Sequence, residues 1–191
     1  MFAGYIRPSL CLLFVMTTLL GIAYPIAMTG LAKAVFPSQA AGSLIHRGNT
    51  LVGSSLIGQN FADPKYFWGR PSATAPQAYN GLASGGSNLG PLNPALTDKV
   101  TAEVKLFHDA DPGNARPVPV DLVTASASGL DPEISAAAAD YQAARVARLR
   151  NIPLSTIQAL IARHRKSALF DVLGEARVNV LELNLALDSL R

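Results

Sequence analysis

The longest uninterrupted apolar stretch of the chain lies near its N-terminus. Between Pro8 and Ala32 only Cys11 and Tyr24 have ionisable side chains, while Arg7 precedes the stretch and Lys33 follows it. A helix of about twenty apolar residues crosses the roughly 30 Å hydrocarbon core of a bilayer. The pattern therefore predicts a transmembrane helix over residues 9–32, after a short tail over residues 1–8.

A cleaved signal peptide is the alternative for this stretch. Ala32-Lys33-Ala34 has the small-x-small form of a cleavage site. However, the apolar core of a signal peptide has only about 7–15 residues. We therefore favour an uncleaved helix. Pro25 predicts a kink in it, because proline has no amide proton to donate to the preceding turn.

Beyond the apolar stretch the pattern predicts a linker over residues 33–49 and a single soluble domain over residues 50–191. Thr50–Ile57 is rich in β-branched residues but contains Gly53, which favours a bulged strand or a short strand pair. Asn93 as N-cap and Pro94 as first residue predict a helix with apolar positions at helical spacing.

Four further elements follow from capping residues and periodicity. Asp131 and Pro132 predict the start of an Ala-rich helix that ends near Arg150. The other three are a strand over 119–124, a helix over 153–164 and a strand over 178–185. The fold class is therefore mixed α/β, leaning towards α+β.

The segment from Asn60 to Pro94 is unusual, because it is rich in Gly and Pro and has few helix or strand signals. Long stretches of this kind in a compact domain are either functional or disordered. The segment also contains five aromatic residues, which disordered tracts seldom have: Phe61, Tyr66, Phe67, Trp68 and Tyr79. We therefore expect an ordered loop fixed by its aromatic side chains.

Charge and cysteine content exclude several classes of function. Of the 16 Lys and Arg residues only Arg7 precedes residue 33, so the soluble part nearly balances its 13 Asp and Glu residues. No basic cluster points to nucleic acid. Cys11, the single cysteine, lies in the apolar stretch, so the soluble part has neither a disulfide nor a cysteine-based zinc site.

The sequence contains no recognisable catalytic motif. His46, His108 and His164 are far apart, and no metal-binding or serine-hydrolase motif is present. We therefore predict no catalytic residue, no metal site and no cofactor of the chain's own. A membrane-anchored extracytoplasmic enzyme without a recognised motif is the alternative.

Two loop motifs are candidates for binding. Ser84-Gly85-Gly86-Ser87-Asn88 can present backbone amides to an anion, so it is a candidate for nucleotide or partner contact, although paired glycines more often form a tight turn. A partner interface is predicted at Tyr66, Phe67, Trp68, Arg70, Tyr79 and Asn80, since aromatic and Arg residues dominate interface hot spots. The alternative is that these aromatics fix their own loop to the core.

Three arginines at the end of the Ala-rich helix, Arg145, Arg148 and Arg150, are interpreted as a solvated helix end rather than a binding patch.

Several strings along nearly the whole chain resemble one known family. They are TGLAKAVFPSQAAGSLI (29–45), GSSLIGQNF (53–61), YFWGRPSAT (66–74), YNGLASGGSNLGPLNPAL (79–96), VPVDLVTASASGLDPEIS (118–135) and RVNVLELNLALD (177–188). In this order and spacing they resemble the C subunit of the bacterial Kdp potassium-transporting P-type ATPase.

The resemblance implies a non-catalytic accessory subunit of an ATP-driven, high-affinity potassium importer in the bacterial inner membrane. The partners that it implies are a channel-like potassium-translocating subunit, a P-type ATPase subunit that uses ATP and Mg²⁺, a small hydrophobic subunit, and membrane lipid. It also implies a catalytic chaperone that raises the ATP affinity of the ATPase subunit, with the Ser84–Ser87 loop likened to nucleotide-contacting signatures.

The family's soluble domain is placed outside the cytoplasm, near the ion entrance of the channel-like subunit. A loop on that side cannot touch cytoplasmic ATP, because the bilayer intervenes. We therefore expect the Phe61–Pro94 segment to dock on the channel-like subunit and to shape the external ion entrance. Charge around the apolar stretch leaves the orientation open.

Overall fold

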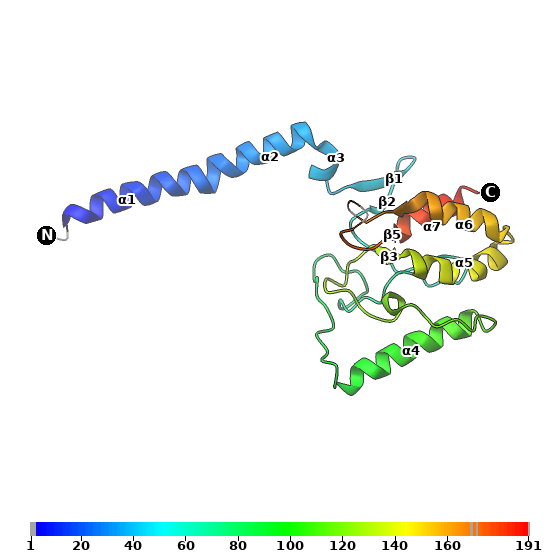
Figure 1. Cartoon of the computed structure of the whole chain (residues 1–191). Coiled ribbons are helices and arrows are strands. Elements are labelled where there is room, and N and C mark those ends of the chain that lie inside the picture. The colour runs from blue at the N-terminus through cyan, green and yellow to red at the C-terminus, as the bar shows by residue number, and fades with distance from the viewer. Residues whose placement is uncertain (1–2, 169, 171, 191) are drawn as a thin grey trace. The chain divides into compact units, whose positions relative to one another are not determined.

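The computed structural model describes residues 3–168, 170 and 172–190. The chain forms two compact units, with the boundary between Leu44 and Ile45. The N-terminal unit consists of helices, and the C-terminal unit combines helices with small antiparallel sheets (Figure 1). The expected mixed α/β class with one N-terminal apolar helix is confirmed.

The N-terminal unit is a long helix interrupted by one wider turn. Helices α1 (Ala3–Thr18) and α2 (Tyr24–Val35) are joined by a π-helical turn, η1 (Leu19–Ala23). The Tyr24 amide donates to the Leu19 carbonyl five residues before it. This wider turn immediately precedes Pro25, whose ring would clash with the fourth preceding carbonyl in a regular α-helix. A π turn thus lies directly before Pro25, and the kink expected at this proline stays a prediction.

The apolar helix is long enough to span a membrane. Residues Gly4–Val35 form 32 consecutive helical positions with mean hydropathy 2.1, and no part of the most apolar window is buried. The helix therefore extends beyond both ends of the expected 9–32 span. A short helix, α3 (Pro37–Ala40), follows it.

A hairpin leads into the C-terminal unit. Strand β1 (Leu44–Arg47) pairs with β2 (Thr50–Ser54) across Gly48-Asn49, where Gly48 has a φ of +60°. Positive φ is available to glycine without a steric penalty. The strand predicted from Thr50 is therefore present, and its partner lies within the expected linker.

A three-stranded antiparallel sheet and three helices contain much of the core. The sheet has the order β3 (Glu133–Ser135), β5 (Arg177–Asn179) and β4 (Arg165–Lys166). In its register Ile134 lies opposite Val178. The helices are α5 (Ala136–Arg150), α6 (Leu154–His164) and α7 (Val180–Asp188).

The expected strand over 119–124 is wrong. Val120–Leu122 forms a 3₁₀ turn, η2, in which the Leu122 amide donates to the Pro119 carbonyl. The Asp121 carboxylate accepts hydrogen bonds from the Ser135 amide and hydroxyl, 2.7 and 3.2 Å away. Asp121 therefore ties the turn to the start of α5.

The Ala-rich helix begins later than predicted. Asp131 accepts from the Glu133 amide, but the chain then continues as strand β3 rather than as helix. Ser135 is the N-cap, because its hydroxyl accepts from the Ala138 amide at 3.0 Å. The side chain that satisfies a first-turn amide thus lies four residues after Asp131.

The expected strand over 178–185 is also wrong beyond Asn179. The Asn179 side chain accepts from the Glu182 amide at 3.0 Å and caps α7. Val180, Leu181, Leu183 and Leu187 are all buried. Because side chains are buried around most of the helix, its apolar residues do not recur only at the helical spacing. Their order in the sequence therefore resembles the alternating pattern of a strand.

The long loop is ordered, as expected. Residues 60–93, all of them described, contain neither helix nor strand, yet Phe67 is 0% exposed in the hydrophobic core. Helix α4 (Pro94–Ala110) follows, with Asn93 accepting from the Ala95 amide at 3.0 Å as predicted. In Figure 1, α4 lies on the opposite side of this unit from α6 and α7.

Candidate functional site

Residues Phe67 and Trp68 are held between two helices by buried side-chain amides. Asn184 of α7 accepts from the Phe67 amide and donates to the Phe67 carbonyl, both at 2.9 Å. Gln142 of α5 accepts from the Trp68 amide at 2.8 Å and donates to its carbonyl at 3.0 Å. The two amides supply the bonds that a neighbouring strand would supply, and so they satisfy a buried irregular backbone.

A buried arginine stacks on Trp68. The Arg145 guanidinium lies 4.3 Å from the ring centroid and donates to Gln142 Oε1 at 2.6 Å and to the Pro64 carbonyl. Arg145 is only 1% exposed. The side chain of Arg150 is also largely covered, at 12% exposed, and it pairs with Asp188 at 2.8 Å. The interpretation of these arginines as a solvated helix end is therefore wrong for both.

The side chain of Arg70 is engaged within the chain. Its guanidinium pairs with Asp131 at 3.1 Å and donates to the Thr124 carbonyl at 3.4 and 3.5 Å. It is partly exposed. Its role at a partner interface stays a prediction, as do those of Phe67 and Trp68, whose rings pack in the core as the alternative interpretation described.

Tyr79 packs beneath Arg70 against two glycines. Its hydroxyl donates to the Arg70 carbonyl at 2.6 Å. A Cβ at Gly58 would meet the Tyr79 ring, and a Cβ at Gly69 would lie 2.7 Å from its hydroxyl. Burial, followed by the nearby Asp131 carboxylate, raises the pKa of Tyr79 to about 12. Tyr79 is therefore a structural, neutral side chain at physiological pH.

Asn80 shapes the loop that follows. Its side chain donates to the Ala75 carbonyl at 2.9 Å and accepts from the Leu82 amide at 3.1 Å. These bonds fix the backbone just before the Gly-rich motif. Phe61 and Tyr66 lie at the other end of the segment, with ring centroids 5.5 Å apart.

The motif Ser84–Asn88 lies against residues 126–129. The Gly85 amide donates to the Ser128 carbonyl at 2.9 Å, and the Ser84 hydroxyl donates to the same oxygen at 3.0 Å. A Cβ at Gly86 would lie 2.9 Å from the Ala127 carbonyl, so this glycine permits close backbone approach. No hydrogen-bonded turn forms at the two glycines. Nucleotide contact by this motif stays a prediction.

A stretch of sequence without charged residues contains this motif, and it was not among the predicted sites. From Pro71 to Thr97 the chain has no Asp, Glu, Lys, Arg or His. Within this tract Leu82 is 99% exposed and Leu92 is 97% exposed. We call residues 71–97 the uncharged tract. The sequence indicates this tract by its lack of charged residues. Depletion of charged residues is typical of the centre of protein interfaces.

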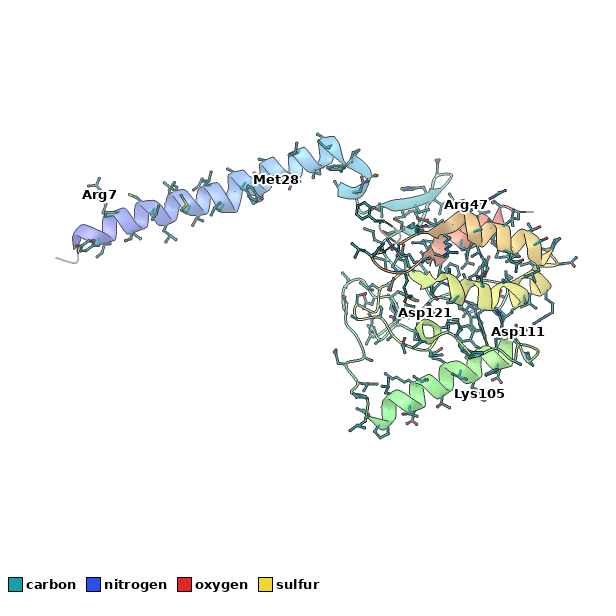
Figure 2. The ribbon with its side chains drawn as sticks, viewed as in Figure 1. Arg7, Met28, Arg47, Lys105, Asp111 and Asp121 are labelled. Carbon is teal, nitrogen blue, oxygen red and sulfur yellow. The ribbon has the colours of Figure 1, made fainter. Side chains whose placement is uncertain are left out.

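A pocket of about 290 Å³ separates α4 from the loop segment. Aromatic residues form much of its wall: Phe61, Trp68, Tyr79 and Phe107. Glu103 of α4 also lines it, and burial raises the pKa of this carboxyl group. Figure 2 labels Lys105 on the same helix, where it pairs with Asp109 on the exposed face.

The described residues contain no cluster of metal-binding side chains. Among the residues that the structure describes, no three His, Cys, Asp or Glu side chains are placed to hold a metal ion. Most of the buried polar side chains of this region form structural hydrogen bonds to the loop backbone, as Asn184 and Gln142 do. The arrangement presents a fixed surface.

Comparison with known proteins identifies the family. A family model described as "KdpC: K+-transporting ATPase, c chain" matches residues 6–189. The chain belongs to the KdpC family. The predicted resemblance is therefore confirmed.

Curated KdpC relatives match the chain over nearly its whole length. The potassium-transporting ATPase KdpC subunit of Variovorax paradoxus (strain S110) is 68% identical over 184 residues, covering 96% of this chain and 95% of the relative. The KdpC subunit of Polaromonas naphthalenivorans (strain CJ2) is 64% identical, covering 97% and 95%. That of Methylococcus capsulatus is 58% identical, covering 98% and 99%.

Family membership makes the chain an accessory subunit of a potassium-transporting ATPase complex. The membrane-length helix agrees with a membrane-anchored transport subunit.

Proposed function

We propose that this KdpC-family chain is a non-catalytic subunit whose soluble domain lies outside the bacterial inner membrane and docks on the channel-like subunit through the uncharged tract. Docking supports assembly and shapes the external potassium entrance. The observation that carries the proposal is the nearly full exposure of Leu82 and Leu92 within an ordered tract of sequence that has no charged residue.

Two such leucines are costly to leave in water. Burying one leucine side chain contributes about 1.5–3 kcal/mol. Apolar anchors at the centre of an interface, surrounded by neutral polar groups, are typical of binding hot spots. Ser84, Ser87 and Asn88 supply such polar groups beside the two leucines in the sequence.

The loop is fixed before it binds, which favours docking. Asn80 holds the backbone before Leu82, and the Gly85 amide binds the Ser128 carbonyl. A preformed surface loses less conformational entropy on association than a mobile one. The uncharged tract thus has the rigidity that a structural subunit requires.

The resemblance implies that this subunit raises the ATP affinity of the ATPase subunit. In this proposal it does so by assembling with the ATPase subunit, and not by contacting the nucleotide directly. The Gly85 amide and the Ser84 hydroxyl already bind Ser128. They are therefore occupied in the free chain. ATP and Mg²⁺ remain ligands of the ATPase subunit in this proposal.

Charge substitution in the uncharged tract tests docking. Leu82→Asp and Leu92→Asp, singly and together, would be expressed with the other Kdp subunits and co-purified in detergent. We expect both single variants to reduce recovery of the complex and the double variant to abolish it, while circular dichroism of the free chain stays unchanged. Leu149→Asp, on exposed α5 surface, is the matched control. Full recovery of the complex with the double variant would contradict the proposal.

Cysteine labelling tests the side of the membrane. Ser87→Cys in a Cys11→Ser background provides a single thiol, because Cys11 is the only native cysteine. We expect an impermeant maleimide to label it from outside in spheroplasts. Labelling only in inverted vesicles would place the domain inside and favour direct ATP contact.

A further inference from the structure

Glu103 is an acidic side chain with no hydrogen-bond or ion-pair partner among the described residues, and it lines a pocket whose wall includes four aromatic residues. It is half-buried on α4, and no hydrogen bond or ion pair joins it to any other residue that the structure describes. It lines both the pocket of about 290 Å³ and a neighbouring pocket of about 220 Å³, which also share Pro71 and Ser72. One carboxylate is thus accessible from two adjoining hollows beneath α4.

The walls suit a cation with an apolar stem. Phe61, Trp68, Tyr79 and Phe107 line the larger pocket. Aromatic faces attract ammonium and guanidinium groups, and apolar walls accept the methylenes of Lys and Arg. A carboxylate in such surroundings is stabilised by a charge-assisted hydrogen bond from the same cation.

The chain's own basic groups nearby are engaged elsewhere. Arg70 lines the larger pocket but directs its guanidinium to Asp131 and Thr124. Arg145 stacks on the Trp68 ring. Lys99 lines the smaller pocket, and no bond joins it to Glu103 among the described residues. Lys99 precedes Glu103 by four residues, and on a helix this order is less favourable for an ion pair than Glu before Lys.

We propose that this pocket receives a Lys or Arg side chain of the partner subunit, with Glu103 as its counter-ion. The inference rests on the proposed docking function, because the pocket is bordered by Pro71 and Ser72 of the uncharged tract. The uncharged leucines then contribute apolar contact, and Glu103 fixes the register of the two subunits.

A small cation provides a direct test on the full chain in detergent. Trp68 lines the pocket and is the only tryptophan, so its indole ¹H–¹⁵N signal reports on occupancy. We expect n-butylammonium to shift this signal saturably and n-butanol to shift it much less. Glu103→Gln should weaken binding about tenfold, the effect of losing one charge-assisted hydrogen bond. Asp98→Asn, an exposed acid on the same helix, should leave binding unchanged.

Two outcomes would overturn the inference. They are a signal that does not respond to n-butylammonium and a response that Glu103→Gln leaves intact. In the assembled complex Glu103→Lys should reduce recovery of the subunits at least as strongly as Leu82→Asp, and unchanged recovery would exclude a partner's basic side chain.

The two proposals fail separately. If the leucine variants disrupt assembly but the indole signal does not respond, docking stands and the cation pocket is excluded. If the indole signal responds but the leucine variants assemble normally, the proposed docking surface is wrong.

Discussion

Asn184 and Phe67, 117 positions apart in the sequence, exchange two hydrogen bonds of 2.9 Å in the core. Through this pair, α7 near the C-terminus holds the backbone of a loop that has no regular structure. Gln142 of α5 does the same for Trp68. The rigidity of the loop segment therefore depends on two amides from distant helices.

Removing one of these amides should destabilise the domain strongly. Asn184→Ala leaves the amide and carbonyl of Phe67 buried without partners, and each such group costs about 1–3 kcal/mol. We expect a loss of about 2–4 kcal/mol in the free energy of unfolding, measured in urea by Trp68 fluorescence. Gln158→Ala, an exposed amide on α6, should change it by less than about 0.5 kcal/mol. Equal stabilities would show that the Phe67 bonds contribute nothing.

Arg145 should not tolerate replacement by lysine. A lysine cannot reproduce a planar guanidinium that both stacks on Trp68 and donates to Gln142 and Pro64. We expect Arg145→Lys to lower the free energy of unfolding by about 2 kcal/mol and to shift the Trp68 emission maximum. Arg163→Lys, at an exposed position of α6, serves as the control and should do neither. A fully stable Arg145→Lys variant would show that the stacking and hydrogen bonds of the Arg145 guanidinium do not stabilise the domain.

Gly58 should be intolerant of any side chain. A Cβ there would meet the Tyr79 ring and lie 2.9 Å from the Asp131 carbonyl. Overpacking of this kind costs about 1–3 kcal/mol, so Gly58→Ala should lower the thermal midpoint. Gly90→Ala, where nothing lies within 4 Å, is the matched control. Its midpoint should stay the same or rise, because alanine restricts the unfolded chain. A neutral Gly58→Ala variant would contradict the packing of Tyr79.

Tyr79 should make stability fall in strong alkali. Burial raises its pKa from 10.0 to about 12. Below pH 10 the phenol is neutral in both the folded and the unfolded states, whereas between about pH 10 and 12 only the unfolded state loses the proton. Stability therefore falls as pH rises through this window, by about 2–3 kcal/mol.

Tyr79→Phe isolates this contribution. Its free energy of unfolding, measured against urea from pH 9 to 12, should fall less steeply than that of the wild-type chain. The difference between the two curves removes the titration of other groups, including Tyr141, whose pKa is also raised by burial. Parallel curves would show that the Tyr79 phenol ionises equally in the two states.

The sequence predicted elements whose signals are local. The apolar helix, the Asn93 cap of α4 and the ordered aromatic loop were all predicted from neighbouring residues. Errors arose where distant residues decide the outcome. Asp131 is a good N-cap, but β3 pairs with β5, and the helix begins only after Ser135. The stretch after Asn179 resembled a strand, because burial on several sides of α7 hides its period.

For the candidate site, too, the sequence showed which residues are present but not their contacts or their exposure. The aromatic and Arg-containing motif was prominent in the sequence, but contacts with Asn184, Gln142 and Asp131 show that most of its groups serve the fold. The exposure of Leu82 and Leu92 could not be predicted, because a leucine is more often buried than exposed. Their position within a tract free of charge was the one signal available in the sequence.

Photo-cross-linking at Leu82 in the assembled complex tests the docking proposal most directly. A benzoylphenylalanine introduced there, in membranes containing the other Kdp subunits, should form an adduct with the channel-like subunit upon illumination. The same probe at Leu149, on the exposed surface of α5, should form none with that subunit. An adduct from Leu149 together with none from Leu82, in a complex that assembles and pumps normally, would contradict docking through the uncharged tract.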